Sequence, residues 1–530
     1  MLIPHFSKLR LLAITFSFFA MALCWTSTPA RSQNITGTIL GTISDPSGAS
    51  VPDARVTITN LATNQSHGAT TSKTGTYEVP YLPPGQYQVT VSHTGFKTTV
   101  RKGITLEVDR RLVINLRLQL GSTATSVTVT GQTPLLNTTS AALGQVVSSR
   151  TTEALPILGR NIFDLAALSA GVMVNPKALG GVASAGTVTG TTQTPLFVSS
   201  DISINGGRYR TNDYLVDGVT VMMPANNNFA IAPTPANTAE FKVLTNSFGP
   251  QYGRSGGGVI SVVTKSGTNH WHGEAYDFLR NRRLNANNYF ADAQGQSKGP
   301  STFDLFGGYA GGPLIKNDTF IFGGFEGSRN HGLQSGLNYT VPTALERNGD
   351  FSQTFDSRGN PVTIYNPFSL CGAFGNPACA TDANGQPIYT RQPFQNNVIP
   401  TSRMNPVALK LMSYVPLPNQ PGTGPQQANN YGWAQNEFAN SNQWSVRIDH
   451  RFTDRNSLFG RVTRNTGELG NTGQFGTIAD NVLGVDVSHV INVVLNDTYT
   501  VSPTNFLNLR YGLTRLFEGR TPIHGAIPLT

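Results

Sequence analysis

The stretch VLTNSFGPQYGRSGGGVISVVTKSGTNHWHG, residues Val243–Gly273, contains the change of pattern that decides the fold. Strand-forming residues give way to three successive glycines, residues 256–258, and β-branched residues resume directly after them. Glycine loses more conformational entropy on folding than any other residue, so three glycines at this place need a structural reason. We therefore expect a junction between two β structures, where the backbone bends and packs so closely that a Cβ atom would clash.

The composition indicates a chain rich in β structure. Of its 530 residues, 38% are hydrophobic and 13% are charged, whereas about 25% are charged in an average soluble domain. Glycine, with 55 residues, and small polar residues replace the missing charge, which is typical of strands joined by many turns. The formal net charge of +9 is scattered, and its densest group, Arg280, Arg282 and Arg283, is small. Nucleic acid is therefore not an expected partner.

The first 30 residues have the layout of a secretory signal peptide. Lys8 and Arg10 precede the apolar run Leu11–Trp25, and small residues follow as far as Ala30. The alternative, a membrane anchor, is disfavoured because the run is shorter than the ~20 residues of a spanning helix. We expect residues 1–30 to be the signal peptide of an exported protein. No later segment of the sequence has the apolar length of a spanning helix, so any crossing of a membrane has to use strands.

Residues 34–120 consist of short alternating strands separated by turns rich in glycine and proline. In RLVINLRLQL, leucine and isoleucine occupy every second position from Leu112 to Leu120. Several strands of this kind at this spacing predict a small β-sandwich. The order GTISDPSGASVPDARVTITN, then TGTYEVPYLPPGQYQVTV, then GF resembles the carboxypeptidase regulatory-like domain, a transthyretin-like sandwich. The resemblance implies an accessory module of a kind suspected of binding carbohydrate or protein, without a zinc-peptidase ligand set.

Residues 121–269 are expected to be a linker followed by a small α/β unit. Turn signals occur at Asn205-Gly206 and at Asp217-Gly218. The motifs LPILGRN, YLVDGV and EFKVLTNSFGPQYGRSGGGVISVVTKSGTN together resemble the plug domain of TonB-dependent outer-membrane transporters, in particular the Oar-like branch. The fold class that follows is mainly β: an N-terminal β-sandwich, a small α/β plug and a partial transmembrane antiparallel β-barrel.

Under this resemblance the glycine run lies at the junction between plug and barrel. The junction residues are Gly256, Gly257, Gly258, Lys265 and Gly267. The glycines are expected to let the backbone pass close to a crowded barrel wall. A phosphate-binding loop is the alternative for this segment, but such a loop needs glycine directly before the lysine, and Thr264 stands there.

Residues 270–530 are expected to begin the barrel. In NQWSVRIDHRF, the apolar Trp444, Val446 and Ile448 alternate with polar residues, and FLNLRYGLTRL behaves in the same way. Such apolar-out, polar-in alternation over about ten residues is typical of transmembrane β-barrels, although a soluble β-sandwich also alternates. About seven strands are expected after His272, against about 22 in transporters of this type. We therefore expect an N-terminal portion of a longer protein or a truncated gene product, with polar lumen side chains such as Arg447, Asp449 and Arg510.

A long segment rich in proline, asparagine and glycine, residues 341–440, interrupts the barrel strands. An insertion of this kind is expected to be an extracellular loop, and long loops often carry function. Cys371 and Cys379 lie within it, in CGAFGNPAC. Two cysteines without a histidine or CxxC partner do not make a zinc site. A loop-closing disulfide in an oxidising compartment is the better interpretation.

One short segment between the sandwich and the plug resembles a TonB box. Its residues are Ser126, Val127, Thr128, Val129, Thr130 and Gly131. Such an element lends an extended strand to a periplasmic TonB-type energy-coupling protein, and strand addition needs little from the side chains. The alternative is a simple edge strand or linker.

No catalytic constellation, metal site or cofactor site is expected from the sequence, so we do not expect an enzyme. The resemblance implies a receptor or transporter of the cell outer membrane that moves a large ligand, a peptide, oligosaccharide or chelate, by plug movement. The alternative is a surface adhesin or carbohydrate-binding protein that transports nothing. The expected partners are outer-membrane lipid, the energy-coupling protein and a ligand such as a glycan or peptide.

Overall fold

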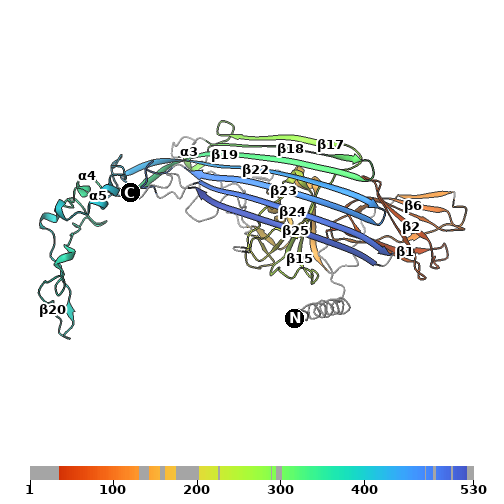
Figure 1. Cartoon of the computed structure of the whole chain (residues 1–530), viewed down its shortest axis with the longest axis horizontal. Helices are drawn as coiled ribbons and strands as arrows, with labels where there is room; N and C mark the ends of the chain where they lie inside the picture. Colours follow the sequence, from red (N-terminus) through yellow and green to blue (C-terminus); the bar gives the residue numbers. More distant parts are fainter. Residues whose placement is uncertain are drawn as a thin grey trace, which may run out of the picture.

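The structure is a computed structural model, in which a β-sandwich, a plug and a sheet of long strands follow one another along the chain (Figure 1). It describes residues 35–123, 125–130, 142–155, 161–174, 202–224, 227–287, 289–293, 301–471, 473–480, 485–502 and 505–521. The expected signal peptide, residues 1–30, and Gly131 lie outside the described residues. No helix among the described residues is long and apolar enough to cross a membrane.

The N-terminal sandwich consists of two sheets whose strands alternate between buried and exposed side chains. One sheet contains β4 (Thr76–Leu82), β1 (Gly37–Ser44), β7 (Arg111–Val113) and β8 (Leu116–Arg117). The other contains, in order, β3 (Ser66–Thr70), β2 (Arg55–Asn60), β5 (Gly85–Ser92), β6 (Thr98–Leu106) and β9 (Ser126–Thr130). Ile39 and Val89, one from each sheet, are fully buried in the shared core. The predicted sandwich is confirmed.

The plug is built on a mixed sheet. In order, its strands are β10 (Leu143–Ser148), β15 (Thr238–Asn246), β16 (Val259–Thr264), β13 (Asp213–Val216) and β14 (Val219–Thr220). Short helices and a small β pair complete it: α2 (Ser149–Ala154), η2 (Ile162–Leu168), η3 (Pro235–Asn237), β11 (Val172–Val174) and β12 (Ile202–Ile204). Phe163, Tyr214 and Phe229 form the centre of its core, with ring centroids 4.7–5.1 Å apart.

Seven of the described strands form one antiparallel sheet, the barrel wall (Figure 1). They are β17 (His272–Asn281), β18 (Ser301–Ile315), β19 (Thr319–Tyr339), β22 (Tyr431–Thr453), β23 (Asn456–Asn471), β24 (Val485–Ser502) and β25 (Asn505–Thr521). Trp444 and Ile448 are 40% and 43% exposed, whereas Ser445 and Arg447 between them are 6% and 7% exposed. Apolar side chains outside and polar ones inside confirm the predicted transmembrane barrel sheet.

The two ends of the barrel wall differ in the length of their connections. The connections after Ile315, Thr453 and Ser502 are two or three residues long, whereas those at the other end are much longer. Short turns face the periplasm and long loops face the exterior in barrels of this kind. The sandwich lies at the short-turn end (Figure 1), where the Asn64 side chain donates to Asn317 at 3.2 Å. The sandwich therefore lies at the short-turn end of the barrel wall.

A folded arm, residues 340–430, extends from the opposite end of the barrel wall (Figure 1). Its short elements are α4 (Ala344–Arg347), η4 (Pro367–Ser369), β20 (Ala380–Thr381), β21 (Pro387–Ile388), η5 (Gln395–Asn397), η6 (Thr401–Arg403) and α5 (Pro406–Met412). A further short helix, α3 (Tyr289–Ala293), follows β17.

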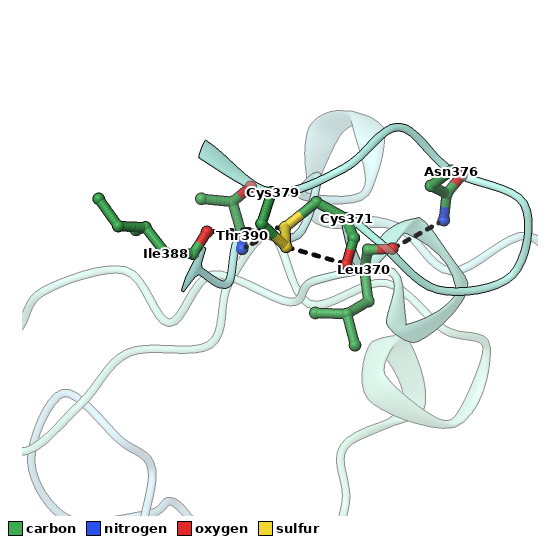
Figure 2. Close-up of a disulfide and its surroundings, with 6 residues drawn as sticks. All are labelled: Leu370, Cys371, Asn376, Cys379, Ile388 and Thr390. Atoms are coloured by element: carbon green, nitrogen blue, oxygen red, sulfur yellow. Dashed lines mark hydrogen bonds between the residues drawn. A yellow bond between two sulfur atoms is a disulfide. The ribbon is translucent and has the colours of Figure 1, made fainter. Parts of the chain in front are cut away.

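A disulfide joins Cys371 to Cys379 within the arm (Figure 2). The Thr390 amide donates to the Cys371 sulfur at 3.3 Å, and the Asn376 side chain donates to the Leu370 carbonyl at 3.0 Å. Closing a loop of this length lowers the entropy of the unfolded chain and so stabilises the folded arm by about 2–3 kcal/mol. The disulfide and these hydrogen bonds fix the tip of an arm that has few buried apolar side chains.

Candidate functional site at the plug and barrel contact

The tip of the β13–β14 hairpin places one acidic side chain of the plug against the barrel wall. Val216 pairs with Val219, so the turn contains two residues, Asp217 with φ 49° and Gly218 with φ 74°. A two-residue hairpin turn of type I′ needs positive φ at both positions, which the Asp-Gly sequence favours. The turn aims the fully buried Asp217 carboxylate at β22 and β23.

Two arginines of the barrel wall hold this carboxylate. Arg461 Nε lies 2.6 Å from Asp217 Oδ2, and Arg447 Nη1 lies 3.6 Å from Asp217 Oδ1. Within the plug, the amide and hydroxyl of Thr264 donate to the same carboxylate at 3.0 and 2.8 Å. Both arginine side chains are almost fully buried, at 8% and 2% exposed for Arg447 and Arg461. We call Asp217, Arg447 and Arg461 the plug clamp.

Further partners complete the charge balance around the plug clamp. Asp449 lies 2.7 Å from Arg447 and accepts from the Ser266 hydroxyl at 2.8 Å. Arg461 also donates to Asn492 at 2.6 Å. Two carboxylates therefore face two guanidinium groups, and side-chain oxygens satisfy remaining donors, as a buried ionic network requires.

Burial and charge act in opposite directions on Asp217. Desolvation raises the pKa of this carboxyl, but Arg461 and Arg447 overcome it and hold the pKa below its usual value. The carboxylate is therefore ionised at neutral pH, and the contact with the barrel is ionic.

A second group of polar contacts lies beside the plug clamp. Arg510 donates to the Gly218 carbonyl at 3.4 Å, and the Thr514 hydroxyl donates to the Thr220 carbonyl at 3.2 Å. The sequence predicts Arg447, Asp449 and Arg510 to line the polar lumen, and in the structure these three residues contact the plug. The sequence marked Asp217-Gly218 as a turn, and the role of its carboxylate was missed. The signal available in the sequence was an aspartate in an Asp-Gly turn directly after the apolar residues Tyr214–Val216.

The glycine run is crowded, but the predicted neighbour is wrong. A Cβ at Gly258 would lie 2.5 Å from Ile204 Cδ1 and 2.6 Å from the Leu244 carbonyl oxygen, and both belong to the plug. A Cβ at Gly257 would meet the side chain of Asn212, which is also in the plug. The backbone is crowded because β16 enters the plug sheet between neighbouring strands, and the nearest described atoms at Gly257 and Gly258 all belong to the plug.

The other two junction residues do contact the barrel wall. A Cβ at Gly267 would lie 2.7 Å from the carbonyl oxygen of Gly312 and would also meet that of Ile321. Lys265 Nζ lies 4.3 Å from the ring centroid of Tyr309, a cation–π contact with β18. The close approach to the barrel therefore occurs about ten residues after the glycine run.

We expect Gly258→Ala to destabilise the plug by about 2 kcal/mol, because overpacking a fixed backbone costs about 1–3 kcal/mol. Gly256→Ala is the matched control, since its Cβ would lie 3.6 Å from Thr211 Cβ, an ordinary contact. Neither glycine has positive φ, so the backbone conformation does not separate the two variants. Thermal unfolding of the purified protein measures the difference. Equal losses in both variants would contradict the crowding assigned to Gly258.

The sandwich docks on the plug through a loop between β6 and β7. Val108 is fully buried and packs with Ile35 against Val263 of the plug. Its amide donates to a carboxylate oxygen of Glu240, and Lys242 Nζ lies 3.1 Å from Asp109 Oδ2. Apolar packing, hydrogen bonds and an ion pair therefore hold the two units together.

Glu240 has an unusual protonation equilibrium in this contact. Burial raises its pKa from 4.5 to about 7, the Val108 amide opposes the shift, and the negative Glu107 adds to it. The carboxyl thus titrates near neutral pH, at the point where sandwich and plug meet.

The TonB-box-like segment lies at the edge of the sandwich. β9 pairs in parallel with β6, from Ser126 opposite Thr98 to Thr130 opposite Lys102. Among the described strands it is the last of its sheet, so one of its edges is unpaired there. The structure thus holds the segment as an ordered strand.

Two family descriptions match the chain. Residues 263–527, half of the chain, match the outer membrane beta barrel domain. Residues 38–119 match the carboxypeptidase regulatory-like domain. The chain therefore belongs to the family of outer-membrane β-barrel proteins.

The chain is homologous to the TonB-dependent transporter Oar of Myxococcus xanthus. The two are 27% identical over 312 residues, which cover 56% of this chain and 27% of the relative. The chain thus spans about a quarter of the length of that relative. The named relative is a transporter, and the solved structures described next are receptors.

Solved structures of receptors align over most of the chain with low scores. The siderophore receptor PirA from Acinetobacter baumannii aligns with a TM-score of 0.38 at 14% identity, over 72% of this chain and 40% of that chain. A mutant of the ferric enterobactin receptor PfeA from Pseudomonas aeruginosa aligns with a TM-score of 0.35 at 11% identity, over 71% of this chain and 41% of that chain.

Proposed function

We propose that the protein is a TonB-dependent outer-membrane receptor and transporter that moves a large ligand when its plug shifts in the barrel. The plug clamp carries the proposal: a single plug carboxylate, Asp217, lies between Arg447 and Arg461 of the barrel wall. A plug that only needed to stay in place could rely on apolar contacts, because a buried ion pair is a weak source of net stability. An ionic contact is specific, and it separates into groups that water solvates well.

The domain division supports the same proposal. It assigns residues 34–120 to a periplasmic accessory sandwich, residues 121–269 to the linker and plug, and residues 270–530 to the barrel. The extracellular loop expected at residues 341–440 corresponds to the arm, residues 340–430, because β22 already begins at Tyr431. Residues 1–30 would direct export. In this arrangement the sandwich occupies the mouth through which a ligand leaves, so it has to move with the plug or release it.

The TonB-box-like segment, Ser126–Gly131, is proposed as the contact for a periplasmic TonB-type partner. Its position supports this role, because a strand partner can add to the unpaired edge of β9 through backbone hydrogen bonds. A pull on β9 would reach the plug through Val108, Asp109 and their contacts with Glu240 and Lys242. The sandwich would then transmit force to the plug.

Labelling of a buried plug cysteine tests transport against adhesion. Val263→Cys places a thiol at a plug position that is 5% exposed, and Val91→Cys places one in the fully buried sandwich core as a control. We expect periplasmic thiol reagents to label Val263→Cys at least threefold faster in energised cells than in cells treated with a protonophore. Val91→Cys should remain unlabelled in both.

A second variant tests the partner contact. Replacing Ser126–Thr130 by a glycine-serine linker should abolish the energy-dependent labelling of Val263→Cys. Equal labelling with and without energy would exclude plug movement and favour the adhesin. Energy-dependent labelling that survives the replacement would remove the role proposed for the segment.

A further inference from the structure

A cavity of about 520 Å³ lies in the extracellular arm, between α4 and α5. Its volume falls within the range of ~300–1,000 Å³ that is usual for ligand sites. The cavity is formed entirely by residues 340–412 of the arm, so it does not depend on the plug or on the plug clamp.

The walls of the cavity are mostly apolar. The apolar side chains that form these walls are Val341, Phe351, Ile399, Met404, Leu409 and Met412. Two of these side chains are methionines, which are unbranched and adapt to ligands of different shape. The cavity therefore fits the apolar body of a ligand.

Two arginines give the cavity a positive charge. Arg347 donates to the carbonyl oxygens of Pro342, Met412, Val415 and Pro416, which orders the guanidinium but does not neutralise it. Arg403 donates to the Asn366 side chain at 3.0 Å, and its other guanidinium N–H groups have no partner among the described residues. Neither arginine forms an ion pair with a described residue.

One carboxylate also lines the cavity, but its acceptor capacity is largely used. Glu346 accepts from the Thr343 amide at 2.9 Å and from the Thr354 hydroxyl at 2.8 Å. Two guanidinium groups against one hydrogen-bonded carboxylate leave the lining with a positive balance. Because a guanidinium binds a carboxylate through two parallel hydrogen bonds, Arg403 is suited to hold such a group.

We propose that this cavity binds an apolar chain that ends in a carboxylate, with the apolar body against Met404 and Leu409 and the carboxylate on Arg403. The inference deepens the proposed function, and it rests on that function only for the arm facing the cell exterior. Two sources share this chemistry: the free C-terminus of a hydrophobic peptide and a fatty acid.

Binding is measured with the full chain in lipid nanodiscs, by the fluorescence anisotropy of dansyl-Gly-Leu-Phe as the free acid and as the C-terminal amide. We expect the acid to bind at least tenfold more tightly than the amide. Arg403→Gln should weaken the binding of the acid about tenfold and leave the binding of the amide unchanged. Arg391→Gln, an exposed arginine of the same arm that does not line the cavity, is the matched control and should behave like the unmodified protein.

A second variant tests the apolar part of the site. Ala408 lines the cavity and is exposed, so Ala408→Trp should fill the space without disturbing a core, and both probes should then bind at least tenfold more weakly. Equal binding of acid and amide, or discrimination that persists in Arg403→Gln, would overturn the carboxylate assignment. Unchanged binding in Ala408→Trp would overturn the location.

Competition identifies the source of the carboxylate. If the site binds an apolar chain that ends in a carboxylate, both octanoate and acetyl-Leu-Phe should displace the probe. The compound that competes more strongly shows whether the site prefers a fatty acid or a peptide C-terminus. Failure of both to displace the probe would overturn the proposal. Binding does not require energy, so a chain that binds the acid but shows no energy-dependent labelling of Val263→Cys would refute transport alone.

Discussion

Replacing Asp217 by asparagine should weaken the interaction between plug and barrel wall by about 3–5 kcal/mol, the usual cost of removing one partner from a buried ion pair. The asparagine oxygen can still accept from the Thr264 amide, and its NH2 group can donate to the Thr264 hydroxyl. Arg447 and Arg461, however, remain buried without a plug carboxylate between them. The loss therefore falls on the interface and leaves the interior of the plug intact.

Two measurements report the release of the plug. Cells that carry Asp217→Asn should become sensitive to vancomycin, which an intact outer membrane excludes, and the plug should become accessible to protease in the purified protein. Asp213→Asn is the matched control. Asp213 lies in the same β13–β14 hairpin and is 1% exposed, but its carboxylate accepts from Thr220 within the plug at 3.2 Å.

The Asp213→Asn substitution is expected to have a small effect, because burial already raises the pKa of Asp213 and a neutral amide therefore suits this site. A double-mutant cycle isolates the pair. Arg461→Gln in the Asp217→Asn background should recover part of the loss, because one unpaired buried charge is removed. Equal effects of Asp217→Asn and Asp213→Asn would contradict the plug clamp.

Raising the pH from 5 to 8 should weaken the docking of the sandwich on the plug by about 2.5 kcal/mol. The pKa of Glu240 rises from 4.5 to about 7 in the docked state, and each unit corresponds to about 1.4 kcal/mol. A carboxyl whose pKa is raised by docking stabilises the docked state fully below pH 4.5 and loses this contribution as the pH rises through 7. The charged groups that face it are Glu107, Asp109 and Lys242.

Hydrogen exchange of the Val108 amide measures this docking, because that amide donates to Glu240. Its protection, corrected for the intrinsic exchange rate, should fall about 100-fold between pH 5 and pH 8. Glu240→Gln should remove most of this pH dependence, whereas Glu78→Gln, which alters an exposed ion pair with Arg111, should preserve it. Protection that stays constant with pH in the unmodified protein would refute the assignment.

The barrel wall could be predicted from the sequence because the membrane imposes a strict rule. A strand between lipid and a polar interior has to alternate with a period of two, so Trp444, Val446 and Ile448 carried the signal by themselves. The sandwich was recognised for a related reason, since its strands also have one buried face. Both predictions depend on local patterns, which a single sequence contains.

The plug clamp could not be predicted in this way. Asp217 and Arg461 are 244 positions apart, and no period connects them. The error over the glycine run has the same origin: the sequence showed that Gly258 needed space, but the neighbour, Leu244, was decided by strand pairing. Crowding is a local property of the backbone, whereas the identity of the neighbour is a property of the fold.

The TonB-box-like segment marks a different limit. The sequence of residues 126–131 fits an edge strand as well as a strand lent to a partner, because both need an extended backbone and little else. In the structure β9 pairs with β6, and pairing on one side leaves the other side open to a second strand.

Cysteine labelling in intact cells tests the central claim, that the arm faces the exterior and the sandwich closes the periplasmic mouth. Asn384→Cys places a thiol in the exposed tip of the arm, and Asp454→Cys places one in a short turn where the native side chain is 83% exposed. A membrane-impermeant maleimide should label Asn384→Cys at once and Asp454→Cys only after the outer membrane is permeabilised. The opposite pattern, or immediate labelling of both, would contradict this orientation.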